Sequence, residues 1–91
     1  MQWDGATRAA EASQAAYFRG LLADQREETL SALARSHDRL RECMAGAQVV
    51  GLRTMARMRF DVRELEAKKR ELDRLIAALD RRFSALWSRQ S

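Results

Sequence analysis

Between Met55 and Trp87, apolar side chains recur at alternating intervals of three and four residues. This spacing returns side chains to one narrow face of an α-helix, and it is typical of a helix that packs along a second helix. Lys69 is the one charged member of the row. The row, which we call the second seam, consists of Met55, Met58, Val62, Leu65, Lys69, Leu72, Ile76, Leu79, Phe83 and Leu86.

The first half of the chain carries a less regular row with the same intervals. Six alanines between Ala6 and Ala16 favour a helix, because alanine has the highest helix propensity. Gly20 is a weak point in this helix, but we expect the helix to continue through it. The expected first seam consists of Leu22, Leu30, Leu33, His37, Leu40 and Met44, with alanines at the corresponding positions nearer the N-terminus.

Two glycines, Gly46 and Gly51, separate these two rows, and either can adopt the left-handed backbone that ends a helix. We therefore expect an all-α fold in a single domain, residues 1–91. Its two long helices form an antiparallel coiled-coil hairpin, with arms at about 5–45 and 52–89 and a turn at about 46–51. The alternative is one long continuous helix in a coiled-coil oligomer, because the apolar pattern continues through the glycines with one slip.

Folding the arms back about Gln48 gives an expected register. It places Leu33 opposite Val62, and in the outer part it sets large side chains of the second arm against alanines of the first. It also places Arg26 opposite Lys69, two like charges that need an acidic partner. At the open end it brings Trp3 near Trp87.

The residues that carry most enzyme chemistry are scarce. The single cysteine, Cys43, excludes an internal disulfide, and the single histidine, His37, lies six residues before it, which is not a facing interval on a helix. One Cys and one His supply no set of metal ligands. We therefore expect a protein that is not an enzyme, with no catalytic residues, no metal, no cofactor and no small-molecule substrate.

No stretch resembles a targeting or membrane segment. The N-terminal residues lack the basic start and apolar core of a secretory signal, and the longest nearly apolar run, 44–52, is too short to cross a bilayer. We expect no transmembrane segment and a soluble, intracellular protein of the cytoplasm.

Charge is unevenly distributed along the chain. Residues 1–49 carry six Arg and seven Asp or Glu, whereas residues 50–91 carry eleven Arg or Lys and six Asp or Glu. A basic second arm permits phosphate contacts, but Glu64, Glu66, Glu71 and Asp73 lie among its basic residues, which is typical of a solvated face. Nucleic-acid binding is therefore the alternative function rather than the main one.

Several apolar residues fall outside the two seams, and Phe60 lies opposite the second seam. Such residues beside a two-helix seam indicate another interface, for self-association or for a partner's helices. The sequence therefore predicts a protein–protein interaction module, a small assembly, adaptor or chaperone-like subunit of a larger complex. The predicted partner-binding residues are Tyr17, Phe18, Phe60, Leu75 and Trp87.

Overall fold

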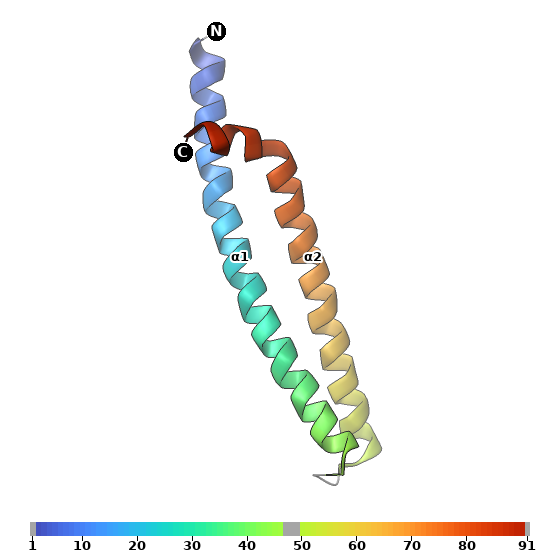
Figure 1. Ribbon diagram of the computed structural model, residues 1–91. Helices are drawn as coiled ribbons and strands as arrows, with labels where there is room; N and C mark the ends of the chain where they lie inside the picture. The colour runs from blue at the N-terminus through green and yellow to red at the C-terminus, as the bar shows by residue number, and fades with distance from the viewer. Residues whose placement is uncertain (1, 47–49, 91) are drawn as a thin grey trace.

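The computed structural model consists of two long antiparallel helices, α1 (Gln2–Met44) and α2 (Leu52–Gln90) (Figure 1). The structure describes residues 2–46 and 50–90, with side chains described for 5–46 and 50–89, and these residues include no strand. The predicted antiparallel helical hairpin is confirmed. The alternative, one continuous helix, is wrong.

The hairpin is a rod rather than a globule. It measures 67 × 21 × 15 Å, and its radius of gyration is 19.8 Å, whereas a compact domain of this length has a radius of about 12 Å. Two helices side by side can bury only the stripe along which they touch. The apolar residues of this chain are therefore held in a seam, and no large side chain is completely buried among the described residues.

A left-handed glycine ends α1. The Ala45 amide donates to the Arg41 carbonyl over 2.9 Å, the Gly46 amide donates to the Cys43 carbonyl over 3.2 Å, and Gly46 has a φ of +84°. These bonds occupy carbonyls that the last turn of a helix leaves without partners. The prediction for Gly46 is confirmed, while Gln48, at the expected centre of the turn, lies outside the described residues.

The buried row on α2 follows the second seam. Val62, Leu72 and Phe83 are 5 to 8% exposed, and the other members of the seam are half-buried. Lys69 is also half-buried, and its ammonium donates a 2.8 Å hydrogen bond to Asp73. A charged residue is tolerated in this seam because it finds a carboxylate one turn further along its own helix.

The buried row on α1 differs from the expected first seam. His37 and Met44 are exposed, and Ser36 and Cys43 are buried in their place. The buried residues are Ala12, Ala15, Thr29, Ser36 and Cys43, which again follow three- and four-residue spacing when Arg19, Leu22, Arg26, Leu33 and Leu40 are included. The predicted row had His37 and Met44 where the buried residues are their predecessors, Ser36 and Cys43, so those two assignments were wrong.

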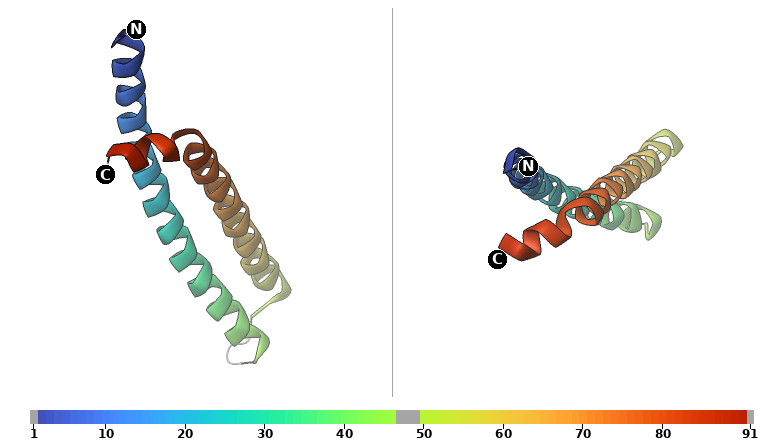
Figure 2. Two further views of the ribbon diagram at one scale, coloured as in Figure 1. Left: turned by 45° about the horizontal axis from the view of Figure 1, so that its top comes forward. Right: turned by 90° about the horizontal axis from the view of Figure 1, so that it is seen from above.

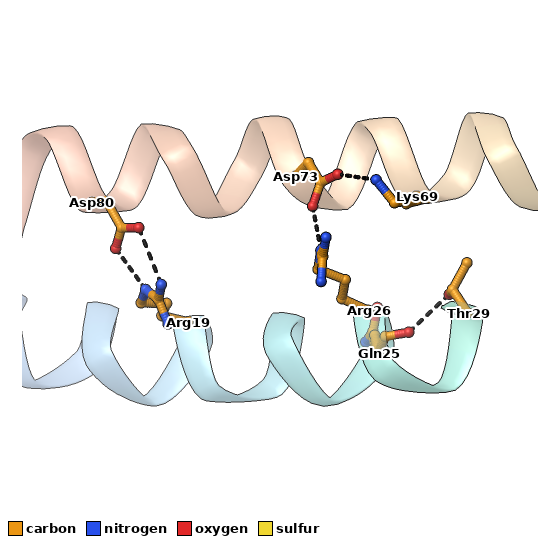
Figure 3. Close-up of polar contacts among 7 residues, drawn as sticks. All are labelled: Arg19, Gln25, Arg26, Thr29, Lys69, Asp73 and Asp80. Atoms are coloured by element: carbon orange, nitrogen blue, oxygen red, sulfur yellow. Dashed lines mark hydrogen bonds and ion pairs between the residues drawn. The ribbon is translucent and has the colours of Figure 1, made fainter. Parts of the chain in front are cut away.

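In the middle of the hairpin the expected register is displaced by about one helical turn, whereas at the open end Phe83 packs on Ala12 as that register requires. Arg26 bonds the carboxylate of Asp73 rather than lying opposite Lys69 alone, so Arg26 and Lys69 share one acid (Figure 3). The like-charge layer expected from the sequence is thus neutralised within the chain. The buried hydroxyl of Thr29, next to this layer, donates to the Gln25 carbonyl over 2.8 Å.

Near its C-terminal end α2 bends, and its last turns cross over α1 (Figures 1 and 2). The crossing brings Phe83 onto Ala12 and Ala15, and these three form the one cluster of buried apolar residues in the described part of the chain. Trp87 stacks on Phe83 with ring centroids 5.8 Å apart, and its indole Nε1–H donates to the Ala12 carbonyl over 2.9 Å. Trp87 therefore closes the open end against α1, while the side chain of Trp3 lies outside the described residues.

Candidate interaction surfaces

One side of the hairpin carries a row of ion pairs between the helices. Arg19 Nε and Nη2 donate to the two carboxylate oxygens of Asp80 over 2.5 and 3.1 Å, and Arg26 Nε donates to Asp73 (Figure 3). The two pairs are seven residues apart on both helices, so they occupy equivalent positions in successive heptads.

A third contact continues this row toward the turn, where His37 Nε2 lies 3.5 Å from Glu66 Oε1. Glu66 precedes Asp73 by seven residues, as Asp73 precedes Asp80. We call this side, defined by Arg19–Asp80, Arg26–Asp73 and His37–Glu66, the ladder face. Its paired carboxylates and cations specify the antiparallel register, because a slip by one turn would separate them.

The arginine pairs of the ladder face lower the pKa values of two of its acids, Asp80 and Asp73. The hydrogen bond from Arg19 holds the pKa of Asp80 below its ordinary value, and the same contact raises the pKa of Arg19. The pKa of Asp73 is lowered by hydrogen bonds from Lys69 and then from Arg26. These carboxylates are consequently ionised at neutral pH, and their charge is used inside the hairpin.

Open grooves run along the opposite side of the seam, and each is lined by both helices. Near the turn the lining includes Ser36, Arg39 and Asp61, and at the open end it includes Glu11 and Arg82. Arg82 Nη2 lies 3.9 Å from Glu11 Oε2 across this groove. We call this side the groove face.

Phe18 and Leu75 belong to the groove face. Phe18 lies seven residues from Glu11, and Leu75 lies seven residues from Arg82, and a heptad returns a coiled-coil helix to the same face. By the same argument Leu21 and Ala78 lie two heptads from Arg35 and Glu64, which line the groove near the turn. The structure thus brings two predicted partner-binding residues, Phe18 and Leu75, onto one face.

The other predicted partner-binding residues have different positions. Tyr17 is 67% exposed and meets Phe18 edge to face, with ring centroids 6.2 Å apart. Phe60 is 53% exposed and lies on the outward face of α2, away from the other aromatic residues. Trp87 is engaged at the crossing with α1. Leu21, 41% exposed, was not among the predicted residues, although its position four residues after Tyr17 could have indicated it.

The outward face of α2 is basic. This outward face consists of two rows of positions that repeat every seven residues, one starting at Arg53 and the other at Ala56. All of these positions except Ala77 are exposed. No acid occupies any of these positions, because the acids of α2 fall on the ladder face or the groove face. The charged residues of this outward stripe are Arg53, Arg63, Arg70, Arg74 and Arg81.

The residues that could support catalysis or metal binding are separated. Cys43 is buried in the seam with its Sγ 3.8 Å from Met58 Sδ, whereas His37 is exposed on the ladder face. Among residues 5–46 and 50–89, no three His, Cys, Asp or Glu side chains come together as a metal site. Cys43 and His37 are therefore not brought together in one site.

Comparison with protein-family models, with curated proteins and with solved structures gives no match. Within the described part of the chain, neither helix has an apolar stretch long enough to cross a membrane.

Proposed function

We propose that this protein is a non-enzymatic helical hairpin that binds other helices, as a small assembly, adaptor or chaperone-like subunit of a larger complex. The observation that carries the proposal is the apolar surface left outside the seam. Tyr17, Phe18 and Leu21 lie within one turn of α1, and each is 41 to 67% exposed. Grouped exposed apolar side chains, unlike scattered ones, are typical of interaction surfaces.

The total exposed area supports the proposal. The hairpin exposes 7193 Å², whereas a compact monomer of its mass, 10.4 kDa, exposes about 5,400 Å². The excess reflects the rod shape, which leaves most side chains on the outside. A second pair of helices would cover much of it, as in four-helix bundles.

The chemistry of the described polar groups also supports a non-catalytic role. The carboxylates with lowered pKa values, Glu71, Asp73 and Asp80, are bound to arginines of the same chain, and no described buried side-chain N or O atom lacks a hydrogen bond. Groups poised for catalysis are usually perturbed by burial within a cleft. In this hairpin the groups with shifted pKa values are carboxylates and arginines that are paired with each other within the chain.

Photo-crosslinking in the cells that make the chain tests the proposal. A photoreactive phenylalanine analogue replaces Phe18, and the matched control carries it at Ser31, an exposed position on the same helix. We expect a discrete adduct from position 18 and none from position 31, with the adduct's mass giving the identity of the partner. Absence of any adduct from positions 18, 21 and 75 would contradict an interaction role.

A second function has one specific observation in its favour. The outward stripe of α2, from Arg53 to Arg81, spans about 42 Å at 1.5 Å per residue. No acid occupies a position of the stripe, although Arg74 is paired with the neighbouring Glu71. This arrangement favours contact with a polyanion such as a nucleic-acid backbone.

Salt titration tests this second function. If arginines of the stripe bind phosphates, affinity for arbitrary duplex DNA falls steeply with salt, and Arg63→Glu with Arg70→Glu flattens the slope. The charge-matched control is Arg8→Glu with Arg41→Glu, on α1. No measurable binding by the unmodified protein at low salt would remove nucleic acid as a partner.

A further inference from the structure

The groove face has an apolar centre between charged ends. Phe18 and Leu21 on α1 lie at about the same height along the rod as Leu75 and Ala78 on α2. The numbers of residues paired across the hairpin add up to between 93 and 103, with Glu11–Arg82 and His37–Glu66 at the extremes and 99 in Arg19–Asp80. Phe18 and Leu21 are 49 and 41% exposed. This centre is flanked by Glu11 and Arg82 toward the open end.

At three levels of this face the two helices carry opposite charges. Glu11 on α1 lies at the height of Arg82 on α2, and Arg35 on α1 lies at the height of Asp61 and Glu64. Toward the turn the signs reverse again, and Glu42 on α1 lies at the height of Arg57. The α1 half of the groove face is therefore complementary to the α2 half at these three levels. At one further level, between Leu21 and Arg35, Glu28 and Glu71 are both acidic, and Glu71 is paired with Arg74 of its own helix.

A two-fold axis parallel to the rod makes the groove faces of two copies complementary to each other. Such an axis places α1 of one copy over α2 of the other without changing height, so opposite charges meet at the three levels named above. Phe18 and Leu21 then meet the Leu75 and Ala78 positions of the second copy. Opposite charges meet at Arg35 and Glu64, once on each side of the axis.

We propose that a second copy of this chain docks on the groove face about a two-fold axis parallel to the helices, which gives a four-helix bundle. The inference rests on the proposed interaction function and names its partner. The area supports it: a standard interface buries about 800 Å² on each partner, which is well within the excess exposure of the rod, about 1,800 Å² over a compact monomer of its mass. The ladder face and the basic outward stripe of α2 remain exposed in this dimer.

Sedimentation equilibrium of the purified chain tests the docking face. We expect a dimer at micromolar concentration, and Phe18→Asp is expected to weaken it by about a hundredfold, because it places a charge at the apolar centre. Phe60→Asp, which introduces the same charge at a similarly exposed aromatic residue outside the groove face, should leave the dimer unchanged. Equal loss in the two variants, or a monomer at all concentrations, would overturn the proposal.

A mixing experiment tests the pairing itself. In a homodimer of Arg35→Glu, the new glutamate faces Glu64 of the other copy twice. In a homodimer of Glu64→Arg, the new arginine faces Arg35 twice. Each variant alone should therefore dimerise about tenfold more weakly. An equimolar mixture restores both opposite-charge pairs in the heterodimer, and we expect dimerisation to recover. A charge effect within one chain cannot be relieved by mixing, so no recovery would overturn the proposed pairing.

The direction of the axis has its own measurement. With Cys43→Ser as background, a spin label at Ala45 of each copy reports the distance between the two turns. The parallel axis predicts a separation well under half of the 67 Å rod length, whereas a perpendicular axis through the centre of the apolar patch predicts the turns at opposite ends of the dimer. The second result would overturn the proposal. If position 18 crosslinks to a different protein and the purified chain is a monomer, docking of a second copy is wrong but the proposed interaction function is not.

Discussion

The two helices contribute unequal halves to the seam. α2 supplies large apolar side chains such as Val62, Leu72 and Phe83, whereas the buried residues of α1 are small or polar, among them Ala15 and Ser36. The large side chains of one helix fit over the small ones of the other, as close packing of two helices requires. α1 adds the arginines of the ladder. One helix thus supplies most of the apolar burial, and the other supplies close approach and the charges that specify register.

The largest expected effect comes from a charge in the α2 seam. Leu72 is 5% exposed, and Leu72→Asp should cost more than about 3 kcal/mol, because it buries a carboxylate without a partner. That is a large part of the stability of a chain of this size, so we expect loss of most of the helical circular dichroism. The matched control on α1 is Met44→Asp, at a residue that is 64% exposed, with an expected change below about 0.5 kcal/mol. An equal loss of stability in the two variants would show that Met44 is buried in the seam.

The next effect tests the small half of the seam. Ala15→Leu adds three carbons under Phe83 and should cost about 1–3 kcal/mol by overpacking. Ala16→Leu adds the same side chain at the adjacent, exposed position and should be nearly neutral. The melting temperatures of the two variants, measured at one protein concentration, test this difference. A larger loss for Ala16→Leu would mean that α1 is rotated from the position described above.

Two glycines should respond with opposite signs. Gly46 has a φ of +84°, so Gly46→Ala should lower the free energy of unfolding by about 1–2 kcal/mol, since a Cβ strains the left-handed conformation. Gly20 lies inside α1 with open space around it, so Gly20→Ala should raise stability by about 0.5–1 kcal/mol through helix propensity. Urea unfolding measures both changes. Stabilisation by Gly46→Ala would contradict the glycine cap of α1.

The smallest effect concerns the ladder. Arg19 and Asp80 are each 40% exposed, so Asp80→Asn should cost less than about 1 kcal/mol at pH 7. The pKa of Asp80 is lowered from its ordinary value of 3.8 in the folded protein, so the pair stabilises the fold above that pH and its contribution is lost as the pH falls.

The melting temperatures of the wild type and Asp80→Asn should therefore converge on acidification. Asp73 contributes to the acid sensitivity of both proteins in the same direction, because its pKa is also lowered. A constant difference between pH 7 and strong acid would show that the Arg19–Asp80 contact does not act through its charge.

Much of this fold could be predicted from local patterns. The second seam required only the three- and four-residue spacing of residues such as Leu72, Leu79 and Phe83, because large apolar side chains at that spacing leave one way to be buried. The end of α1 at Gly46 followed from the tolerance of glycine for positive φ. The aromatic pair Tyr17 and Phe18 could be predicted as surface residues because they fall beside the seam rather than in it.

The rotation of α1 could not be predicted in the same way. Ala15 and Ala16 are both apolar and small, and Leu30 beside Thr29 offers a similar choice, so the sequence supports two adjacent stripes with little energetic difference between them. The ladder was missed for a related reason. Its signal, Arg19 and Arg26 seven residues apart with Asp73 and Asp80 seven apart, becomes visible only when the two helices are placed side by side.

The sequence by itself determined two long helices, the buried stripe of α2 and the glycine that ends α1, because these depend on spacing and backbone preference within a single helix. Tertiary structure alone decided which stripe of α1 is buried, how the helices are registered, and that Trp87 reaches the Ala12 carbonyl where α2 crosses α1. The physical reason is that small side chains on α1 constrain their own burial weakly. The large seam residues and acids of α2 supply the energy that selects among the alternatives.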